Sequence, residues 1–235
     1  MVIPTYKEVE NLRILLPALA QLPVEVLVVD DASKDGTRQW IDELRSKGAH
    51  IDIYERGAKL GLGSAYKEAF TKSLTKSYDG IIQMDADGSH RVEDLSLLIK
   101  VFHENPEIDL IIGSRWIPGG AVKNWSKHRE YLSRIANFYS RIMLGFSVRD
   151  STAGFRIYRT SLLHRMRLVR IESEGYAFQI EMTREAIKAG GRIKEVPILF
   201  VERELGTSKM SKKIIGEALV KVTKWGLSRV FTRQI

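Results

Sequence analysis

The sequence predicts an α/β protein built on one mixed, mostly parallel sheet, and three observations support this. Short aliphatic runs alternate with amphipathic helical stretches along the first half of the chain, which is the pattern of βαβ units. The chain has 235 residues, of which 44% are hydrophobic, so it is long enough to bury one large core. No internal repeat or low-complexity linker divides it. We therefore expect a single α/β domain.

Each element follows from the spacing of its apolar residues, which differs between strands and helices. Strands are predicted at residues 24–30, 51–54, 80–84 and 108–113. Helices are predicted around Trp40, Ile41 and Leu44, and at residues 62–74, 92–103, 129–144 and 211–231. A turn at residues 33–36 precedes the first of these helices, and Gly61 and Gly63 open the second.

Composition excludes several classes of protein. The chain contains no cysteine, so it has neither a disulfide framework nor a thiolate metal site. No apolar run approaches the length needed to span a membrane, and the N-terminus lacks the basic-then-apolar plan of a signal peptide. We therefore expect a protein that is made and kept in the cytoplasm.

The positive charge is concentrated near the C-terminus. The net charge is +8, and from Arg203 onwards eight basic residues face two acidic ones. Such a cluster fits an anionic membrane surface, a phosphorylated substrate or a nucleic acid. Nucleic acid is the weakest of these partners, because no recognised binding motif accompanies the charge.

Two aspartates separated by one residue follow the predicted strand at residues 80–84. Asp85 and Asp87 leave it at its carboxyl end, which in an open α/β sheet is the edge where ligands bind. Carboxylates spaced in this way point to opposite faces of a strand, so both reach one ion only if the chain bends, and Gly88 permits the bend. Their oxygens suit Mg²⁺ or Mn²⁺. A turn that caps the next helix through Asp87 or Ser89 would explain the same residues, and both interpretations are open.

A second candidate site lies at the start of the predicted helix at residues 129–144. Arg129 and Ser133 are four residues apart and hence lie on one face of the helix. Free backbone amides at a helix N-terminus bind anions, and a guanidinium group strengthens such a site. A solvated basic face is the simpler interpretation.

Seven motifs follow one another along nearly the whole chain. They are Pro4-Thr5-Tyr6-Lys7-Glu8, Val29-Asp30-Asp31 with Ser33-x-Asp35-Gly36-Thr37, Gly61-x-Gly63-x-Ala65, Asp85-Ala86-Asp87-Gly88-Ser89-His90, Gly113-Ser114-Arg115, Asp150-Ser151-Thr152-Ala153-Gly154-Phe155-Arg156 and Gly206-Thr207-Ser208-Lys209-Met210. Together they resemble the inverting glycosyltransferases of family 2, and among them the polyprenol-phosphate (dolichol-phosphate) mannose synthases. The resemblance implies a GT-A (Rossmann-like) fold.

The resemblance also implies roles in binding a nucleotide-sugar donor. The positions that hold the base and ribose match Pro4, Tyr6, Glu8, Val29 and Asp31. Those that hold the metal and the diphosphate match Asp85, Ala86, Asp87 and Ser89, with the metal at Asp85, Asp87 and Ser89. Arg203 and Lys209 match residues that close over the donor. A cation there would offset the charge that grows on the departing nucleoside diphosphate.

For the sugar pocket, the resemblance suggests Asp150 and Arg156 together with Gln179 and Glu181 of the following helix. An internal ion pair and polar residues on a helix surface would explain these four residues equally well.

On the acceptor side, Arg115, Arg129 and Ser133 match the positions that grip a lipid phosphate. A phosphate is already ionised at neutral pH, so it needs to be aimed but needs no general base. Attack from the face opposite the leaving group would invert the anomeric centre.

The last predicted helix fits a lipid acceptor without help from the resemblance. One face carries Ile215, Leu219, Val222, Trp225 and Val230, and another carries Lys213, Glu217, Lys221 and Lys224. A basic amphipathic helix is typical of a membrane interface, and packing on the catalytic domain is the alternative. We expect a glycosyltransferase domain at residues 1–210 and an interface helix at residues 211–235.

Four departures from the family pattern concern details. The first strand, which begins with Met1-Val2-Ile3, is short. Arg91-Val92 replaces a frequent Pro-Pro, Lys7 replaces a frequent Asn, and Ser89 stands where some relatives have Gln. The contact of Ser89 with the metal is therefore either direct or through water.

The sequence thus predicts an enzyme that uses Mg²⁺ or Mn²⁺ to transfer mannose from GDP-mannose to a polyprenyl (dolichyl) phosphate. It is expected to be a peripheral protein at the cytoplasmic face of the cell membrane and to bind no nucleic acid. An enzyme that uses UDP-glucose or a UDP-N-acetylhexosamine is the alternative, because Asp31 does not distinguish guanine from uracil. A non-catalytic nucleotide-sugar or membrane-binding module is a further alternative, against which the intact Asp85 and Asp87 argue.

Overall fold

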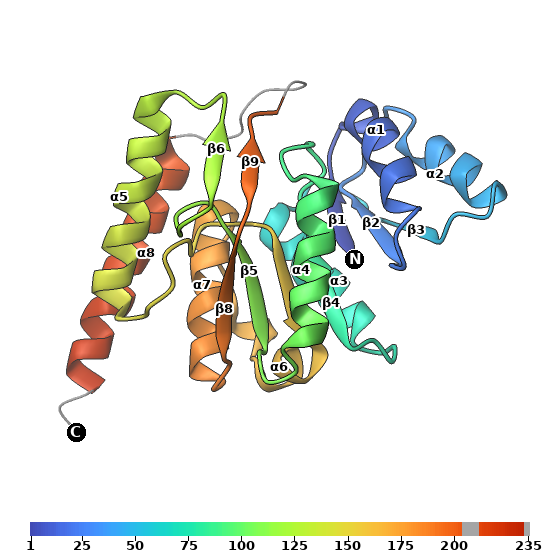
Figure 1. The fold of residues 1–235 in the computed structure, drawn as a ribbon. Coiled ribbons are helices and arrows are strands. Elements are labelled where there is room, and N and C mark those ends of the chain that lie inside the picture. Colours follow the sequence, from blue (N-terminus) through green and yellow to red (C-terminus); the bar gives the residue numbers. More distant parts are fainter. Residues whose placement is uncertain (204–211, 233–235) are drawn as a thin grey trace.

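Seven strands form the central sheet in the order β3-β2-β1-β4-β7-β5-β8 (Figure 1). The computed structural model describes residues 1–203 and 212–232. The strands are β1 (Val2–Thr5), β2 (Val26–Asp30), β3 (Ile51–Glu55), β4 (Gly80–Gln83), β5 (Leu110–Ser114), β7 (Arg156–Arg159) and β8 (Ile193–Pro197). β7 runs antiparallel to both β4 and β5, and the other neighbours pair in parallel. The expectation of a mixed, mostly parallel sheet is confirmed.

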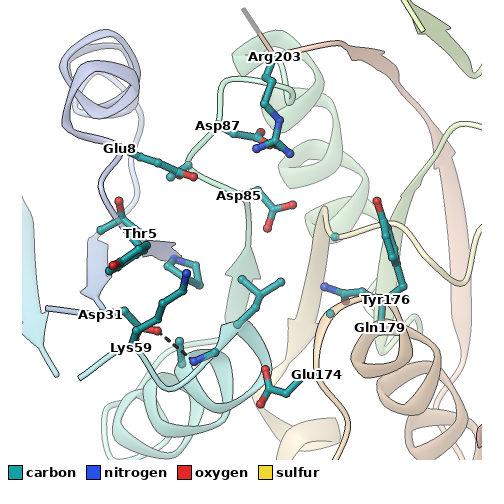
Figure 2. Close-up of a pocket in the computed structure, with 18 of the residues that line it drawn as sticks. Thr5, Glu8, Asp31, Lys59, Asp85, Asp87, Glu174, Tyr176, Gln179 and Arg203 are labelled. Atoms are coloured by element: carbon teal, nitrogen blue, oxygen red, sulfur yellow. Dashed lines mark hydrogen bonds and ion pairs between the residues drawn. The ribbon is translucent and has the colours of Figure 1, made fainter. Parts of the chain in front are cut away.

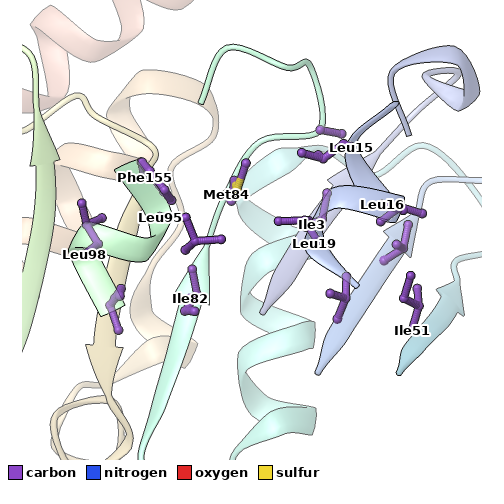
Figure 3. Close-up of a cluster of buried hydrophobic side chains, with 14 of the residues drawn as sticks. Ile3, Leu15, Leu16, Leu19, Ile51, Ile82, Met84, Leu95, Leu98 and Phe155 are labelled. Carbon is purple, nitrogen blue, oxygen red and sulfur yellow. The ribbon is translucent and has the colours of Figure 1, made fainter. Parts of the chain in front are cut away.

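Helices cover both faces of this sheet. One face carries α1 (Val9–Leu19), α2 (Thr37–Ser46) and α4 (Val92–Glu104), and the other carries α3 (Leu62–Ser73), α6 (Thr160–Arg165) and α7 (Gly175–Lys188). Successive strand residues alternate between the faces, so Ile3 joins the first cluster and Val2 joins the second. Figure 3 shows Ile3 in the first cluster with leucines of α1 and α4. Complete burial of a leucine such as Leu16 contributes roughly 1.5–3 kcal/mol.

The order of the connections creates a switch point at β1. From β1 the chain moves outwards through β2 to β3, and it then returns to β4 on the other side of β1. The loops that follow β1 and β4 therefore diverge at the carboxyl ends of these strands, which is where an open α/β sheet leaves a crevice for a ligand. β1 has only four residues, as expected, and all of them are buried.

Two further helices pack beside α7. α5 (Lys127–Leu144) and α8 (Lys212–Thr232) lie side by side (Figure 1), and Leu144, Ile180 and Val222 join them to α7. One face of α8 thus packs on α5 and α7, while Leu219 and Leu227 are 45% and 53% exposed. Within the described ranges, no helix has the length and apolar character needed to cross a bilayer.

Several elements were not predicted from the sequence. They are α1, α6, the 3-10 helix η1 (Leu168–Arg170), β7, β8, and the two strands of a small parallel sheet, β6 (Ala121–Lys123) and β9 (Leu199–Val201). The helix predicted at residues 129–144 begins earlier, at Lys127. The Ser126 hydroxyl caps it by accepting a hydrogen bond from the backbone N–H of Arg129 at 3.3 Å.

Candidate active site

A cavity of about 380 Å³ opens at the carboxyl ends of β1, β2 and β4 (Figure 2). Of the residues expected to bind the donor, the cavity is lined by Pro4, Tyr6, Glu8, Asp31, Asp85, Ala86, Asp87, Gln179 and Arg203. Val29 does not line it, because its side chain is buried in the second core cluster. Ser89 does not line the cavity either, and its hydroxyl is buried. Lys209 lies outside the described residues.

Asp85 and Asp87 both reach the cavity because the chain bends after β4. Gly88 has φ of +74°, a left-handed conformation that favours glycine. Asp87 accepts a hydrogen bond from the backbone N–H of Ser89 at 3.1 Å. Neither residue caps α4, however, because its N-cap is Arg91 and no side chain makes the capping bond. The interpretation of Asp87 and Ser89 as helix caps is therefore wrong.

The surroundings of the Asp85 carboxyl group disfavour its ionised form. The buried Tyr66 donates a hydrogen bond from its hydroxyl to Asp85 Oδ1 at 3.1 Å. Burial, with the charge of Asp87 as the second cause, raises the pKa of Asp85 to about 7. Two carboxylates that repel each other are stabilised by a positive charge between or beside them.

The two aspartates fit a divalent metal that takes its other ligands from elsewhere. The Arg203 guanidinium lies 2.8 Å from Asp87 Oδ2, so a cation already stands beside this carboxylate. In the part of the chain that the structure describes, no group of three or more His, Cys, Asp or Glu side chains could hold a metal. Mg²⁺ and Mn²⁺ suit a site of one or two carboxylates, because substrate phosphates and water complete their coordination.

At the far end of the cavity, Asp31 organises a loop. Its Oδ1 accepts a hydrogen bond from Arg56 at 2.6 Å, and its Oδ2 accepts from the backbone N–H groups of Leu60 and Gly61, both at 3.1 Å. This loop carries Lys59, whose ammonium lies 4.1 Å from the centre of the Tyr6 ring. Arg56 and Lys59 were not predicted from the sequence, which carries no motif around them.

Glu174 joins α7 to the start of α3 and was also missed. Its carboxylate accepts hydrogen bonds from the backbone N–H groups of Gly63 at 2.6 Å and Ser64 at 3.1 Å. These amides are among the free donors of the α3 N-terminus. A Cβ at Gly63 would lie 2.5 Å from the Ser173 carbonyl oxygen, so glycine is required for this close approach. The Gly61-x-Gly63 motif was the sequence signal of this contact.

Of the four residues suggested for the sugar pocket, only Gln179 lines the cavity. Its Oε1 accepts a hydrogen bond from Gln83 at 2.9 Å. Asp150 is paired internally with Arg115, and Glu181 accepts a hydrogen bond from the Ser173 backbone at 3.0 Å. Arg156 is fully buried and donates to the carbonyl oxygens of Ala153 and Ser151. Asp150 thus forms an internal ion pair, although its partner is Arg115 and not Arg156. The interpretation of Gln179 and Glu181 as polar residues on a helix surface is wrong, because both are buried.

A second, largely apolar cavity of about 240 Å³ lies between α5 and α8. It is lined by Arg115, Trp125, Arg129, Leu132, Ser133, Ile135, Ala136, Tyr139, Ser140, Thr152, Tyr176, Ile180, Ala218, Leu219 and Val222. We call it the groove. All three residues expected to grip a lipid phosphate, Arg115, Arg129 and Ser133, therefore lie together.

Arg115 is fixed at one end of the groove. Its Nε and Nη2 donate to the two carboxylate oxygens of Asp150, both at 2.7 Å, and Nη2 also donates to Thr152 Oγ1 at 2.9 Å. Burial acts to lower the pKa of Arg115. The charge and hydrogen bonds of Asp150, with a smaller contribution from Tyr176, outweigh burial and raise this pKa. Arg115 is therefore a permanent, rigidly held cation.

Arg129 is held by an ion pair and by an aromatic ring. Its guanidinium pairs with Glu202 and lies 4.0 Å from the centre of the Trp125 ring. Its side chain is 16% exposed, so the interpretation as a solvated basic face is wrong. A planar guanidinium held in this way suits the geometry of a phosphate.

The fold and this site define a glycosyltransferase. Residues 1–167 match the model of glycosyl transferase family 2, and the chain belongs to this family. It is 48% identical over 229 residues to an undecaprenyl-phosphate mannosyltransferase of Micrococcus luteus, which covers 97% of this chain and 93% of that protein. It is 46% identical over 230 residues to a polyprenol monophosphomannose synthase of Mycolicibacterium smegmatis, which covers 97% and 86%.

Solved structures confirm the GT-A fold. Glucosyl-3-phosphoglycerate synthase from Mycobacterium tuberculosis in complex with Mg²⁺ and uridine diphosphate has a TM-score of 0.67 at 17% identity, covering 95% of this chain and 78% of that one. The same enzyme with Mn²⁺, uridine-diphosphate-glucose and glycerol 3-phosphate has a TM-score of 0.62 at 19% identity, covering 97% and 78%. Divalent metals are thus bound on this fold by structural neighbours.

Proposed function

We propose that this glycosyltransferase transfers mannose from GDP-mannose to a polyprenyl phosphate, with inversion at the anomeric carbon. The names of the two relatives, a mannosyltransferase and a monophosphomannose synthase that act on polyprenyl phosphates, support it. The observation that carries the proposal is that two cavities share lining residues, Thr152 and Tyr176. The first holds the carboxylates of Asp85 and Asp87, and the second, the apolar groove, holds Arg115 and Arg129. A phosphate with an apolar tail has the chemistry that fits this groove.

In the donor cavity, we assign the metal and the diphosphate to Asp85 and Asp87. A bound Mg²⁺ or Mn²⁺ would offset the negative charge that develops on the leaving diphosphate. We assign Tyr6 and Lys59 to the base and Gln179 to the sugar, since all three line this cavity. Arg203, 2.8 Å from Asp87 Oδ2, would add a positive charge beside the leaving group.

In the groove, Arg115, Arg129 and Ser133 bind the acceptor phosphate. Among the described residues, Asp150 and Thr152 accept the hydrogen bonds of Arg115 Nε and Nη2. Nη1 is therefore the atom of Arg115 that would donate to a phosphate oxygen. The phosphate is ionised at neutral pH and attacks without losing a proton, so the reaction needs positioning and no general base. The apolar walls of α5 and α8 take the first part of the prenyl chain.

We further propose that the enzyme is a peripheral protein at the cytoplasmic face of the cell membrane. Beside the groove, α5 and α8 carry several large apolar side chains that are exposed in the described structure. We call them the apolar rim, and they are Tyr131, Ile135, Phe138, Ile142, Leu219, Val220 and Leu227. A lipid surface at this rim would bring the prenyl chain directly to the groove.

A donor panel tests the proposed function. The purified chain is mixed with one short polyprenyl phosphate in detergent, with Mg²⁺ or Mn²⁺, and with radiolabelled GDP-mannose, UDP-glucose or UDP-N-acetylglucosamine. Label from GDP-mannose should move into the organic phase, and a chelator should stop it. Transfer from UDP-glucose without transfer from GDP-mannose would overturn the assignment of the donor. With glycerol 3-phosphate offered as a second acceptor, transfer to it but not to the lipid would overturn the assignment of the acceptor.

A further inference from the structure

The donor cavity and the groove share part of their walls. Among the described residues, Thr152 and Tyr176 line both. A sugar in the cavity and a phosphate in the groove must meet where the two spaces join, because the acceptor oxygen forms its bond directly to the anomeric carbon. These two residues therefore stand at the place of reaction.

The two shared residues differ in whether their hydroxyls are available. Thr152 Oγ1 accepts hydrogen bonds from Arg115 Nη2 at 2.9 Å and from Asn137 Nδ2 at 3.0 Å, and it donates to Asp150 Oδ1 at 3.2 Å. It is fully used in holding Arg115. Tyr176, by contrast, makes no hydrogen bond through its hydroxyl within the described residues, although its side chain is only partly exposed.

Tyr176 is directed towards the space that the substrates would share. It lies in the first turn of α7, after Gly175, whose φ is +56°. Figure 2 shows its ring standing across the cavity from Asp85, with the hydroxyl at the end remote from the helix. On the other side it is close enough to Arg115 to act on the charge of that guanidinium. A phenol in this position is a hydrogen-bond donor beside a fixed cation.

We propose that the Tyr176 hydroxyl donates a hydrogen bond to the acceptor phosphate and aligns its attacking oxygen with the anomeric carbon. The inference rests on the proposed function. Ser133 lies on the same helix as Arg129, so Tyr176 adds a third element, α7, to the loop after β5 and to α5. Donors from three elements fix the orientation of a phosphate group more firmly than donors from two.

The step requires no proton transfer to or from Tyr176. A phosphate oxygen forms a bond to the anomeric carbon while the bond from this carbon to the diphosphate oxygen breaks. The nucleoside diphosphate leaves with the bonding electron pair. The tyrosine keeps its proton throughout, so its contribution is orientation and charge stabilisation.

The variant Tyr176→Phe tests this role because it keeps the ring and removes the hydroxyl. We expect kcat for mannosyl transfer to fall by roughly 10- to 100-fold, with the dissociation constant of GDP within twofold of the wild-type value. Slow hydrolysis of GDP-mannose by water, measured without acceptor, should be unchanged. If hydrolysis falls together with transfer, the hydroxyl serves the sugar and the proposal is overturned.

Three comparisons separate this role from a structural one. Tyr78→Phe is the control, because Tyr78 precedes β4 and so lies at the end of this strand opposite Asp85. This variant should behave as the wild type. Tyr176→Leu should lose as much kcat as Tyr176→Phe, whereas a normal Phe variant beside an impaired Leu variant would assign the effect to ring packing and overturn the proposal. Melting temperature and GDP affinity verify that each variant is folded. A wild-type chain that transfers no mannose to polyprenyl phosphate would refute the proposed function, whereas normal kcat in Tyr176→Phe would refute only this inference.

Discussion

Glu202 and Arg203 are consecutive residues whose charged side chains enter two different sites. Glu202 pairs with Arg129 in the groove, and Arg203 pairs with Asp87 in the donor cavity at 2.8 Å. The backbone is fixed just before them, because Val201 N–H donates to the Ser89 carbonyl at 3.1 Å and Glu202 N–H donates to the Lys123 carbonyl at 2.9 Å. A carboxylate thus lies where an anionic acceptor would bind, and a guanidinium lies beside a carboxylate expected to bind a cation.

Replacing Glu202 by Gln should strengthen acceptor binding. The phosphate would no longer compete with a carboxylate for Arg129, and an ion pair of this partly exposed kind is worth up to about 1 kcal/mol. We expect KM for polyprenyl phosphate to fall by roughly fivefold or less, with KM for the sugar nucleotide unchanged. Initial rates at varied lipid concentration measure this. A rise in acceptor KM would show instead that Glu202 positions Arg129.

Asp87→Ala should abolish transfer. The variant removes one of the two carboxylates assigned to the metal and leaves Arg203 without its partner. Loss of one electrostatic contact to a developing charge typically costs about 10²- to 10³-fold in kcat. Transfer assays across a range of Mn²⁺ concentrations measure the loss. Asp42→Ala, at an exposed position on α2, is the matched control, and full activity of Asp87→Ala would remove the metal role.

Tyr66→Phe should weaken metal binding without disturbing the core. The ring of Tyr66 stacks on Phe178 with centroids 5.8 Å apart, and phenylalanine keeps this contact. The hydrogen bond to Asp85 is lost. Removing the partner of a metal-binding carboxylate costs about 10- to 100-fold in metal affinity. Mn²⁺ titration in the presence of GDP, followed by electron paramagnetic resonance, would reveal it, and an unchanged affinity would count against Asp85 as a ligand.

Asp150→Asn should destabilise the fold. The Asp150 and Arg115 side chains are at most 6% exposed, and leaving one member of a buried pair uncompensated costs about 3–5 kcal/mol. The free energy of unfolding in urea should fall by about 3 kcal/mol. Glu43→Gln, which breaks the exposed pair with Lys47, should change it little. Equal effects in both variants would contradict the importance of burial.

Phe138→Ser should reduce membrane binding. Phe138 is 60% exposed on α5 and belongs to the apolar rim. Losing its contact with lipid should lower the partition coefficient into anionic phospholipid vesicles by roughly fivefold, as measured by co-sedimentation. Ile14→Ser is the control, because Ile14 is 72% exposed on α1, far from α5 (Figure 1). Equal losses in both variants would argue against a defined membrane face.

The order of strands and helices around the donor cavity was largely predictable from the sequence. Continuous aliphatic runs identified β2, β4 and β5, and Asp85 and Asp87 were recognisable because they follow such a run. β7 was harder to recognise. Its sequence, Arg-Ile-Tyr-Arg, places Arg156 in the protein interior, where backbone carbonyls satisfy its charge, so its polarity concealed a buried strand.

Side-chain direction accounts for most errors in the predicted site. Val29 and Asp31 lie close in sequence, but Val29 ends in the core and Asp31 in the cavity. Lys221 was predicted to lie on the charged face of the last helix, and its donation to the Ser173 hydroxyl at 3.0 Å was not foreseen. Such contacts join segments far apart in the chain, so no local pattern reveals them. The contribution of Tyr176 to both cavities became visible only in three dimensions.

The small size of the groove has a consequence for the range of lipids that the enzyme can use. With about 240 Å³, it encloses the headgroup and only the nearest part of a prenyl chain, and the remainder must extend into the bilayer. Under the proposed function, recognition is therefore confined to one end of the lipid. Carriers with different numbers of isoprene units would be equivalent substrates, and the same chain would work unaltered in membranes whose carrier lipids differ in length.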